Sequence, residues 1–203
     1  YERSYYGFLA ADRVKAKMPF NAVPLAPALS LSQAISRWSA VARVQELLAI
    51  GEHDQARSEW IFLMDAVPQA DKLQLGSLAL QTGWYDLAVL SSIRAKAWDV
   101  LELRFPMPMS SVFSRFAKAR GVDMSLLYAL ARQESALYHR AQSPVGASGL
   151  MQLMPATASH VAKKMGYSLA GKQQMIDTEV NVRLGGAYLK ELLDNYGGNR
   201  VLA

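Results

Sequence analysis

Residues 132–155 decide the fold, and they read RQESALYHRAQSPVGASGLMQLMP. We expect a helix over 123–138, followed by a glycine-rich loop over 139–150. At 3.6 residues per turn, one face of this helix carries a single charged side chain, that of Glu134. The other residues on that face are Leu127, Leu130, Ala131, Leu137 and Tyr138. Packing of this face is therefore expected to remove water from the Glu134 carboxyl group.

A carboxyl group in such a place can act in catalysis. Loss of hydration disfavours the ionised form, so a buried carboxylic acid can stay protonated near neutral pH. A protonated acid can donate its proton to a leaving group, which is general acid catalysis. Glu134 is therefore the candidate catalytic residue. The alternative is that its side chain turns to water or belongs to a structural network of charges.

Composition limits the classes of protein to which the chain can belong. Its 203 residues allow one large domain or two small ones. Hydrophobic residues make up 51% and charged residues 19%, which is typical of chains with apolar cores and not of disordered ones. No apolar stretch approaches about 18 residues, so any membrane association is expected to be peripheral. The chain starts at Tyr1 in a predicted helix and stops at Ala203, which favours a piece of a longer mature protein.

Charge and reactive side chains exclude several kinds of site. The formal net charge of +5 favours a polyanionic partner, which can be a wall polymer, a nucleic acid or an acidic lipid, and it does not choose among them. No run of Lys and Arg of the nucleic-acid-binding type occurs. The absence of cysteine excludes disulfides, thiolate metal sites and cysteine nucleophiles. His53, His139 and His160 do not have metal-ligand spacing. We therefore expect no metal site and no cofactor.

Almost every segment of the chain predicts helix, and prolines divide the helices into groups. Pro19, Pro24 and Pro27 oppose helix over 19–30, and two prolines within 105–111 indicate a joint between domains. The pattern predicts an all-α protein, with helices over residues 3–18, 32–50, 53–67, 70–82, 84–98, 111–119, 123–138, 155–165 and 178–196.

A motif of the form Gly-x-x-Asp-x-Ala occurs twice in the N-terminal half. Its two copies are Gly51-x-x-Asp54-x-Ala56 and Gly83-x-x-Asp86-x-Ala88. A glycine at the turn and a small residue early in the next helix let two helices approach closely. Repeats of about this length usually form stacked helical hairpins. The motif thus predicts a solenoid-like region that serves as a scaffold or a binding surface.

The signature in residues 132–155 closely resembles that of the soluble lytic transglycosylases, cell-wall enzymes with a lysozyme-like catalytic domain. The shared features are Glu-Ser at 134–135, Ser-Pro-Val-Gly-Ala-Ser-Gly-Leu-Met-Gln at 143–152 and Met-Pro at 154–155. A further motif of the family resembles the set Asn181, Gly185, Tyr188 and Leu189. Residues 5–11 and 101–109 also resemble segments of the family that precede its catalytic domain.

The resemblance covers essentially the whole chain and implies an architecture of three parts. These are the end of an α-superhelical domain over 1–35, a helical linker domain over 36–104 and a lysozyme-like transglycosylase domain over 105–203. The last domain is expected to be incomplete. In the family an Ala-Tyr-Asn-Ala-Gly segment, whose tyrosine lines the active site, follows the position of Ala203.

The resemblance also implies a reaction. Such enzymes cleave the β-1,4 bond between N-acetylmuramic acid and N-acetylglucosamine of peptidoglycan, and they form 1,6-anhydromuramic acid without water. One carboxylate, here Glu134, acts first as acid and then as base. The implied partners are peptidoglycan glycan strands in the periplasm, with cell-wall proteins as candidate partners of the solenoid.

Substrate-binding roles follow from the match to the family motif, for Ser143, Gly149, Met151, Gln152, Met154 and Asn181. Gly149 is expected to let the backbone come close to the sugar. Simpler roles remain open for four of the other residues. Ser143 and Gln152 can cap the loop, and Met154 can pack in the core. Asn181 can be a buried hydrogen-bonding strut.

Two other functions remain open. A lysozyme-type hydrolase needs water and a second carboxylate, which Asp177 or Glu179 would supply at about 6.5–9.5 Å from Glu134. A non-catalytic wall-binding or scaffolding module would use the solenoid to recruit partners and would tolerate Glu134→Gln. The intact Glu134-Ser135 pair and the loop after it argue against the binding module.

Overall fold

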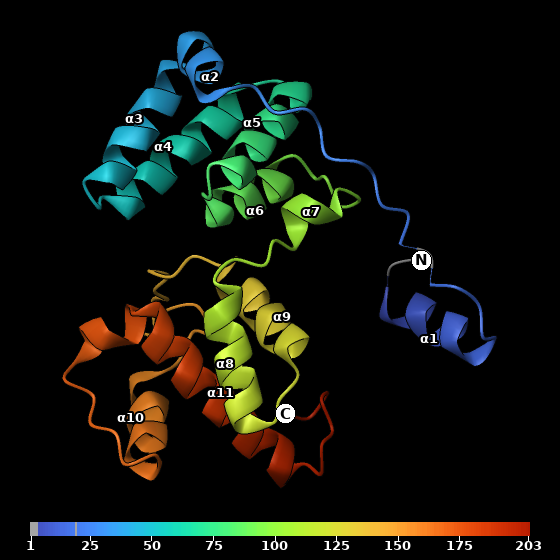
Figure 1. Ribbon diagram of the computed structural model, residues 1–203, viewed down its shortest axis with the longest axis vertical. Helices are drawn as coiled ribbons and strands as arrows, with labels where there is room; N and C mark the ends of the chain where they lie inside the picture. The colour runs from blue at the N-terminus through green and yellow to red at the C-terminus, as the bar shows by residue number, and fades with distance from the viewer. Residues whose placement is uncertain (1–3, 19) are drawn as a thin grey trace.

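The computed structural model describes residues 4–18 and 20–203, and the regular elements in those ranges are helices (Figure 1). The all-α prediction is therefore confirmed. None of the helices in these ranges is long and apolar enough to cross a membrane. In chain order they are α1 (Tyr5–Arg13), α2 (Leu31–Arg37), α3 (Ser39–Ala49), α4 (His53–Ala66), α5 (Gln69–Gln81), α6 (Tyr85–Arg94), α7 (Leu101–Arg104), α8 (Ser110–Arg120), α9 (Met124–Ser135), α10 (Pro155–Lys164), the 3-10 helix η1 (Lys172–Ile176) and α11 (Thr178–Asn195).

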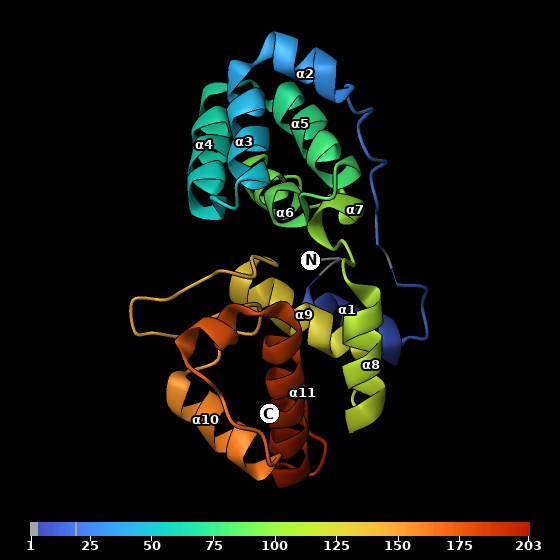
Figure 2. The same ribbon diagram turned by 60° about the vertical axis from the view of Figure 1, so that its left-hand side comes forward.

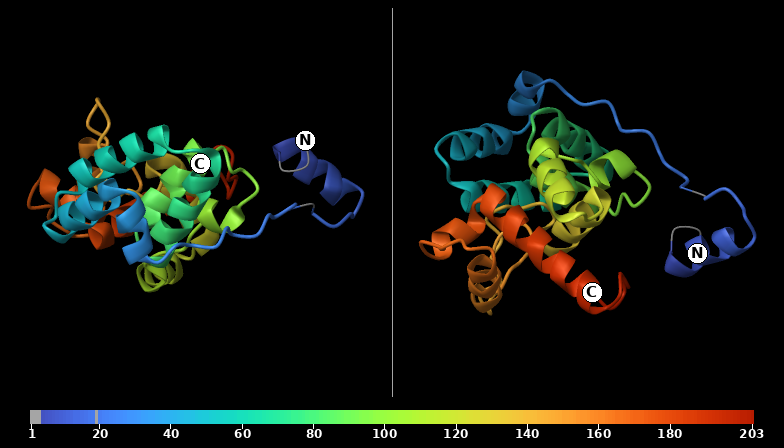
Figure 3. Two further views of the ribbon diagram at one scale, coloured as in Figure 1. Left: turned by 90° about the horizontal axis from the view of Figure 1, so that it is seen from above. Right: turned by 60° about the horizontal axis from the view of Figure 1, so that its bottom comes forward.

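α1 stands apart from the other helices, as Figures 1 and 3 show. Ser4 caps its start, where the side-chain oxygen accepts a hydrogen bond from a backbone N–H of the first turn at 3.1 Å. The helix ends short of the predicted range 3–18, and Lys15 beyond it has a left-handed φ of 53°. Pro19, the predicted boundary, lies outside the described residues, as do residues 1–3.

α2 and α3 are separate helices where the sequence predicts one helix over 32–50, so this prediction is wrong at Trp38. Trp38 has extended backbone angles, with φ −136° and ψ 104°. Its ring packs against the core of the N-terminal half and lies 4.4 Å from the Arg37 guanidinium. Arg37 in turn donates two hydrogen bonds to Asp71 of α5, at 2.8 and 2.9 Å. These tertiary contacts outweigh local helix propensity.

Two hairpins, α3–α4 and α5–α6, stack on each other and confirm the repeat predicted from the Gly-x-x-Asp-x-Ala motif. Their turns have nearly the same geometry, since Gly51 and Gly83 have φ values of 82° and 81°. Left-handed backbone of this kind favours glycine. Ala56 and Ala88 are fully buried where the helices pack. The small residues therefore act as the sequence predicts.

α8 to α11 and η1 form the C-terminal half, at the bottom of Figure 1. In Figure 2, α11 runs between α8 and α10, and it contacts both of them. Phe113 of α8 stacks on Tyr128 of α9, with 4.0 Å between ring centres. The Tyr128 hydroxyl donates to the Pro108 carbonyl at 2.5 Å, and burial raises the pKa of Tyr128 to about 12. These contacts fix α9, which carries Glu134, against α8.

α9 ends at Ser135, so the predicted helix over 123–138 is wrong in its last three residues. Ala136 and Leu137 follow with φ values of 53° and 65°, and the chain turns away from the helix axis. Left-handed backbone is unfavourable for residues other than glycine. The turn places Leu137 and Tyr138 in buried positions, at 4% and 7% exposure. Burial of these two side chains outside the helix therefore offsets the strain.

Candidate active site

Glu134 lies in the last turn of α9, and its side chain is exposed. The prediction that packing removes water from this carboxyl group is therefore wrong. Leu127 and Ala131 on the same face are buried. The helix ends one residue after Glu134, so Leu137 and Tyr138 do not continue this face over the carboxyl group.

Two cavities meet at Glu134, and Gln152 also lines both of them. The larger has a volume of 780 Å³, and polar side chains dominate its lining, among them Asp54, Arg57, Gln133, Arg140, Gln142 and Ser143. The smaller has a volume of 330 Å³ and is lined mainly by apolar side chains, among them Leu130, Met151, Leu153, Met154, Leu189 and Leu192. Glu134 therefore stands at the junction of a polar and an apolar space.

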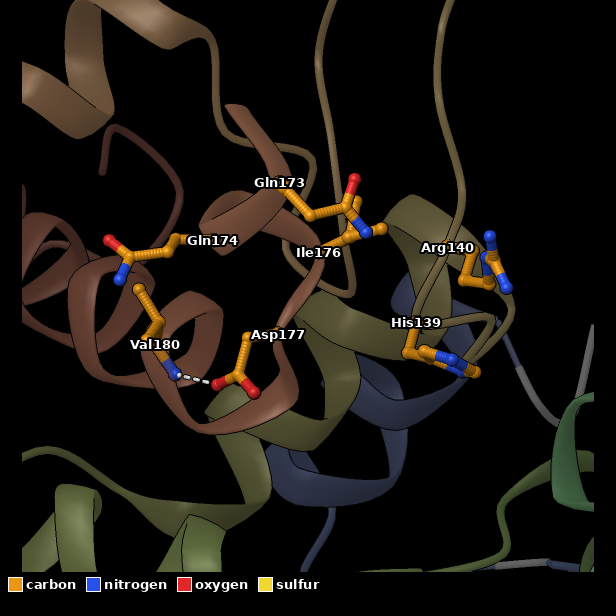
Figure 4. Close-up of a pocket in the computed structure, with 7 residues that line it drawn as sticks. All are labelled: His139, Arg140, Gln173, Gln174, Ile176, Asp177 and Val180. Carbon is orange, nitrogen blue, oxygen red and sulfur yellow. Dashed lines mark hydrogen bonds between the residues drawn. The ribbon is translucent and has the colours of Figure 1, made fainter. Parts of the chain in front are cut away.

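A third cavity of 520 Å³ adjoins the larger one, with which it shares Arg140, Gln173 and Ile176. Figure 4 shows its lining, in which His139 and Arg140 come from the segment after α9 and the two glutamines come from η1. Asp177 caps α11 by accepting a hydrogen bond from a backbone N–H of the first turn at 2.9 Å, drawn as a dashed line in Figure 4. The third cavity therefore continues the larger one, and Glu134 lies where the larger cavity meets the smaller one.

Ser143 and Gln152 both line the larger cavity and both support the loop. The Ser143 oxygen accepts a hydrogen bond from a backbone N–H four residues further along the loop, at 3.0 Å. Gln152 has a φ of 43°, and its side-chain nitrogen donates to two backbone carbonyls of the loop, each at 3.0 Å. The loop-capping role is therefore present for both residues, and both side chains also lie beside the space at Glu134.

Met151 and Met154 line the smaller cavity beside Glu134. Met154 is 40% exposed, which disfavours the alternative of core packing. Met151 is buried against α11, where Gly185 leaves room for its side chain. A Cβ atom added at Gly185 would lie 2.3 Å from the Met151 sulfur. The interior glycine of α11 therefore admits a side chain that forms the cavity wall.

Gly185→Ala is expected to destabilise the protein by about 1–3 kcal/mol, because the new methyl group overlaps Met151. The matched control is Gly186→Ala, where the nearest atoms of Leu127 would lie at 3.6 and 3.8 Å. Alanine at that site should stabilise the helix by about 0.5–1 kcal/mol. Chemical denaturation of both variants measures the two differences, and equal effects would contradict the steric explanation.

Asn181 is fully buried and lines neither of the cavities that meet at the glutamate. Its side-chain oxygen accepts a hydrogen bond from the Met151 N–H at 2.8 Å. Its nitrogen donates to the carbonyls of Ser148 and Met175, at 3.0 and 2.7 Å. A Cβ atom added at Gly149 would lie 2.3 Å from this nitrogen. The geometry favours a strut over substrate contact for Asn181, and it gives Gly149 a role in close packing.

Comparison with known proteins identifies the family. Residues 34–101 match the L domain of soluble lytic murein transglycosylases, and residues 111–203 match the transglycosylase SLT domain. The chain belongs to the soluble lytic transglycosylases. The resemblance inferred from the sequence is thereby confirmed, as is the order of an L domain followed by a lysozyme-like SLT domain. The boundaries 1–35, 36–104 and 105–203 stay predictions.

Similar proteins of known sequence are longer than this chain. It is 37% identical over 205 residues to the soluble lytic murein transglycosylase of Escherichia coli strain K12. It is 36% identical over 203 residues to the soluble lytic murein transglycosylase of Salmonella typhimurium. Each match covers 100% of this chain and 31% of the relative, so the chain spans about a third of the length of these relatives.

Solved structures of two soluble lytic transglycosylases share the fold. The 70 kDa enzyme of Escherichia coli matches with a TM-score of 0.90 at 35% identity, over 98% of this chain and 32% of that one. An inactive mutant of the lytic transglycosylase Slt from Pseudomonas aeruginosa matches with a TM-score of 0.89 at 39% identity, over 98% of this chain and 33% of that one. In that mutant a glutamate is replaced by glutamine.

The L domain supplies one wall of the larger cavity, which the sequence does not predict. The residues concerned are on α4, and they are Asp54, Arg57, Ser58 and Ile61. The first Gly-x-x-Asp-x-Ala copy places Asp54 at the start of a helix, but the motif does not show which side of the molecule that turn faces. η1 also contributes Gln173 and Ile176 to this cavity. A short 3-10 helix of this kind has little sequence pattern by which to find it.

Asp177 and Glu179, the acids considered for a hydrolase, line neither cavity at Glu134. Asp177 caps α11, and Glu179 pairs with an arginine of α8 at 2.6 Å. Asp54 of the L domain is the acidic side chain that shares the larger cavity with Glu134. Its carboxylate accepts a hydrogen bond from the Tyr138 hydroxyl at 2.5 Å.

Charged groups where the L domain meets the SLT domain shift the ionisation of their neighbours. Arg57 lies 3.1 Å from the Asp86 carboxylate and 4.9 Å from the centre of the Tyr138 ring. Burial raises the pKa of Asp86, and the Arg57 guanidinium opposes this effect. Burial, followed by the hydrogen bond to Asp54, raises the pKa of Tyr138, so its hydroxyl remains a donor. Burial and neighbouring basic side chains lower the pKa of His139.

Proposed function

We propose that the protein is a lytic transglycosylase that cleaves the β-1,4 bond between N-acetylmuramic acid and N-acetylglucosamine of peptidoglycan. The observation that carries this proposal is the position of Glu134, whose exposed carboxyl group stands between two cavities. Glu134 also lies in the Glu-Ser motif of the family. The inactive glutamine mutant of the Pseudomonas relative supports a catalytic glutamate.

Glu134 is the proposed catalytic residue and acts alone. It first donates its proton to the glycosidic oxygen as the bond to C1 of the muramic acid breaks. The acetamido oxygen of that sugar stabilises the positive charge at C1. The Glu134 carboxylate then takes the proton of the 6-hydroxyl group, and O6 bonds to C1. The product is a 1,6-anhydro sugar, no water is consumed, and Glu134 regains its proton.

Substrate binding supplies the dry environment that the free chain lacks. Because Glu134 is exposed, the glycan itself must displace water from the carboxyl group when it fills the two cavities. The reacting hydroxyl and C1 belong to one sugar ring, so the step has the advantage of an intramolecular reaction. A second carboxylate is therefore not required.

Other residues of the two cavities take binding roles in this proposal. Ser143 positions the acetamido group, and Gln152 contacts the sugar on either side of Glu134 because it lines both cavities. Met151 and Met154 give the apolar surface of the smaller cavity. The site lies in the periplasm, where peptidoglycan is the partner.

A lysozyme-type hydrolase is the second candidate, and one observation favours it. Asp54 shares the larger cavity with Glu134 and could serve as the base that activates water. The hydrogen bond from Tyr138 occupies one of its oxygens, which opposes that role. The wall-binding module remains a third candidate only if no cleavage occurs.

The test is the chemistry of the released ends. The protein at its full natural length is incubated with purified peptidoglycan, and the soluble muropeptides are weighed by mass spectrometry. We expect ends of 1,6-anhydromuramic acid, lighter by about 18 Da than hydrolytic ends. Reducing ends would instead assign hydrolysis. Absence of any release would move the assignment to wall binding.

Bulgecin A offers a measure of binding that does not depend on turnover. A 70 kDa soluble lytic transglycosylase has been solved in complex with this compound. We expect the cavities at Glu134 to bind it here as well. Titration calorimetry then separates a protein that binds without cleaving from one that does neither.

A further inference from the structure

We infer that Asp54 of the L domain is a positioning residue for the active site. It binds Tyr138 and so fixes the chain segment that directly follows Glu134. The inference rests on the proposed function, since it concerns how the same site keeps its shape. Asp54 and Glu134 lie 80 positions apart in the chain and belong to different domains. Both residues nevertheless line the larger cavity.

The segment after Glu134 needs support from outside the helix. Ala136 and Leu137 have φ values of 53° and 65°, and two successive left-handed residues without glycine are unfavourable. Such a conformation persists only where surrounding contacts determine it. Leu137 is buried, but its neighbour Ala136 is only half-buried, so apolar packing of this pair supplies part of the support.

Tyr138 supplies the specific contact to the L domain. Its hydroxyl donates to Asp54 at 2.5 Å, and its ring lies 4.9 Å from the guanidinium of Arg57. The tyrosine is buried and Asp54 is exposed, so this hydrogen bond is partly buried. Hydrogen bonds to an ionised acceptor are stronger than neutral ones. The first five residues of α4 therefore hold Tyr138 at both its hydroxyl and its ring.

The next two residues make contacts of the same kind. The His139 ring packs edge-on against the His53 ring, with 4.9 Å between centres. Arg140 donates to the Gly51 carbonyl at 2.9 Å. Three consecutive residues thus contact the turn and first helical turn that form one copy of the repeated motif.

Hydrogen bonds also link this segment to a side chain that lines the two cavities. The carbonyl of Ala141 accepts hydrogen bonds from the Gln152 side chain at 3.0 Å and from the Gly149 N–H at 2.8 Å. Gln152 lines both cavities at Glu134. A chain of hydrogen-bonded residues therefore leads from Asp54, through 138–141, to a side chain beside the catalytic group.

The test is a double-mutant cycle on the protein at its full natural length. Asp54→Ala and Tyr138→Phe are each expected to lower kcat for peptidoglycan cleavage by about tenfold, with little change in KM. The double variant is expected to lose no more than either single variant, because both remove the same contact. Asp54→Asn keeps an acceptor oxygen and should retain most of the activity.

Asp65→Ala is the matched control on the same helix. Asp65 is exposed and pairs with Arg94 at 2.9 Å on a part of α4 that does not line the cavity. Its replacement should leave kcat unchanged. Additive losses at Asp54 and Tyr138 would mean that Asp54 contacts substrate directly, which overturns the inference. A lowered melting temperature with normal kcat would also overturn it, since that is a role in stability alone.

A second readout keeps the inference separate from the proposed function. Hydrogen exchange of the peptide over 136–143 should become faster in Asp54→Ala and Tyr138→Phe, and it should not change in Asp65→Ala. If the unaltered protein releases no product, the proposed function fails. The exchange measurement still shows whether the contact between Asp54 and Tyr138 holds this segment in place. Unchanged exchange in both variants would overturn the inference whether or not the protein is active.

Discussion

Glu134→Gln is expected to lower the rate of peptidoglycan cleavage by about 10²- to 10⁴-fold, the range typical of a general acid or base. Glutamine keeps the size of the side chain but cannot donate a proton to the leaving oxygen or accept one from the 6-hydroxyl group. The side chain is exposed and makes no part of the buried core, so stability should change by less than about 0.5 kcal/mol. Release of anhydro muropeptides over time measures the rate.

Two controls make this result specific. Glu179→Gln changes another exposed glutamate of the SLT domain, one that lines neither cavity at Glu134, and it should leave the rate unchanged. Bulgecin A should bind Glu134→Gln with an affinity close to that of the unaltered protein. A Glu134→Gln protein that still cleaves at the normal rate would remove Glu134 from the mechanism.

Asn181→Leu is expected to destabilise the protein by about 2–6 kcal/mol, because the change removes the Asn181 partner of two buried backbone groups, at about 1–3 kcal/mol each. These are the N–H of Met151 and the carbonyl of Met175, whereas the carbonyl of Ser148 keeps its hydrogen bond from the Leu153 N–H at 3.1 Å. Leucine has the same branched shape as asparagine, but its methyl groups need more room than the amide atoms, so steric overlap adds to the loss of hydrogen bonds. Total stabilities are about 5–15 kcal/mol, and this one change can remove a large part. Urea denaturation measures the difference.

Asn195→Ala is the matched change at the exposed end of the same helix, α11, and it should alter stability by less than about 0.5 kcal/mol. A loss below about 1 kcal/mol for Asn181→Leu would show that the loop finds other partners. In that case the strut role of Asn181 would be withdrawn.

Local chemistry explains why much of the fold follows from the sequence. Asp177 accepts a hydrogen bond from the first turn of α11, and Asp123 does the same for α9, at 2.8 Å. Gly51 and Gly83 end their helices in left-handed conformation. Each of these effects depends on residues within one turn, so a single sequence is enough to predict them. Glu134 is a candidate catalytic residue on the same kind of local evidence, namely its place on a helix and in a motif.

The misplaced features depend on contacts between distant residues. Trp38 leaves the helical conformation because its ring packs on the core and its neighbour Arg37 binds Asp71. The helix with Glu134 ends early because Leu137 and Tyr138 pack elsewhere, and Tyr138 does so against the L domain. Periodicity assumes that a helix continues while its pattern does. It therefore predicted burial for Glu134, where the structure leaves the carboxyl group exposed.

The unlike linings of the two cavities at Glu134 have a consequence for the direction of a bound polymer. A glycan strand has two different ends, and an open cleft could receive it in either orientation. With polar side chains on one side of Glu134 and apolar ones on the other, the two orientations differ in binding free energy. A difference of about 1.4 kcal/mol already favours one of them tenfold. For a bound glycan strand, this preference would set which of the two cavities receives the reducing end.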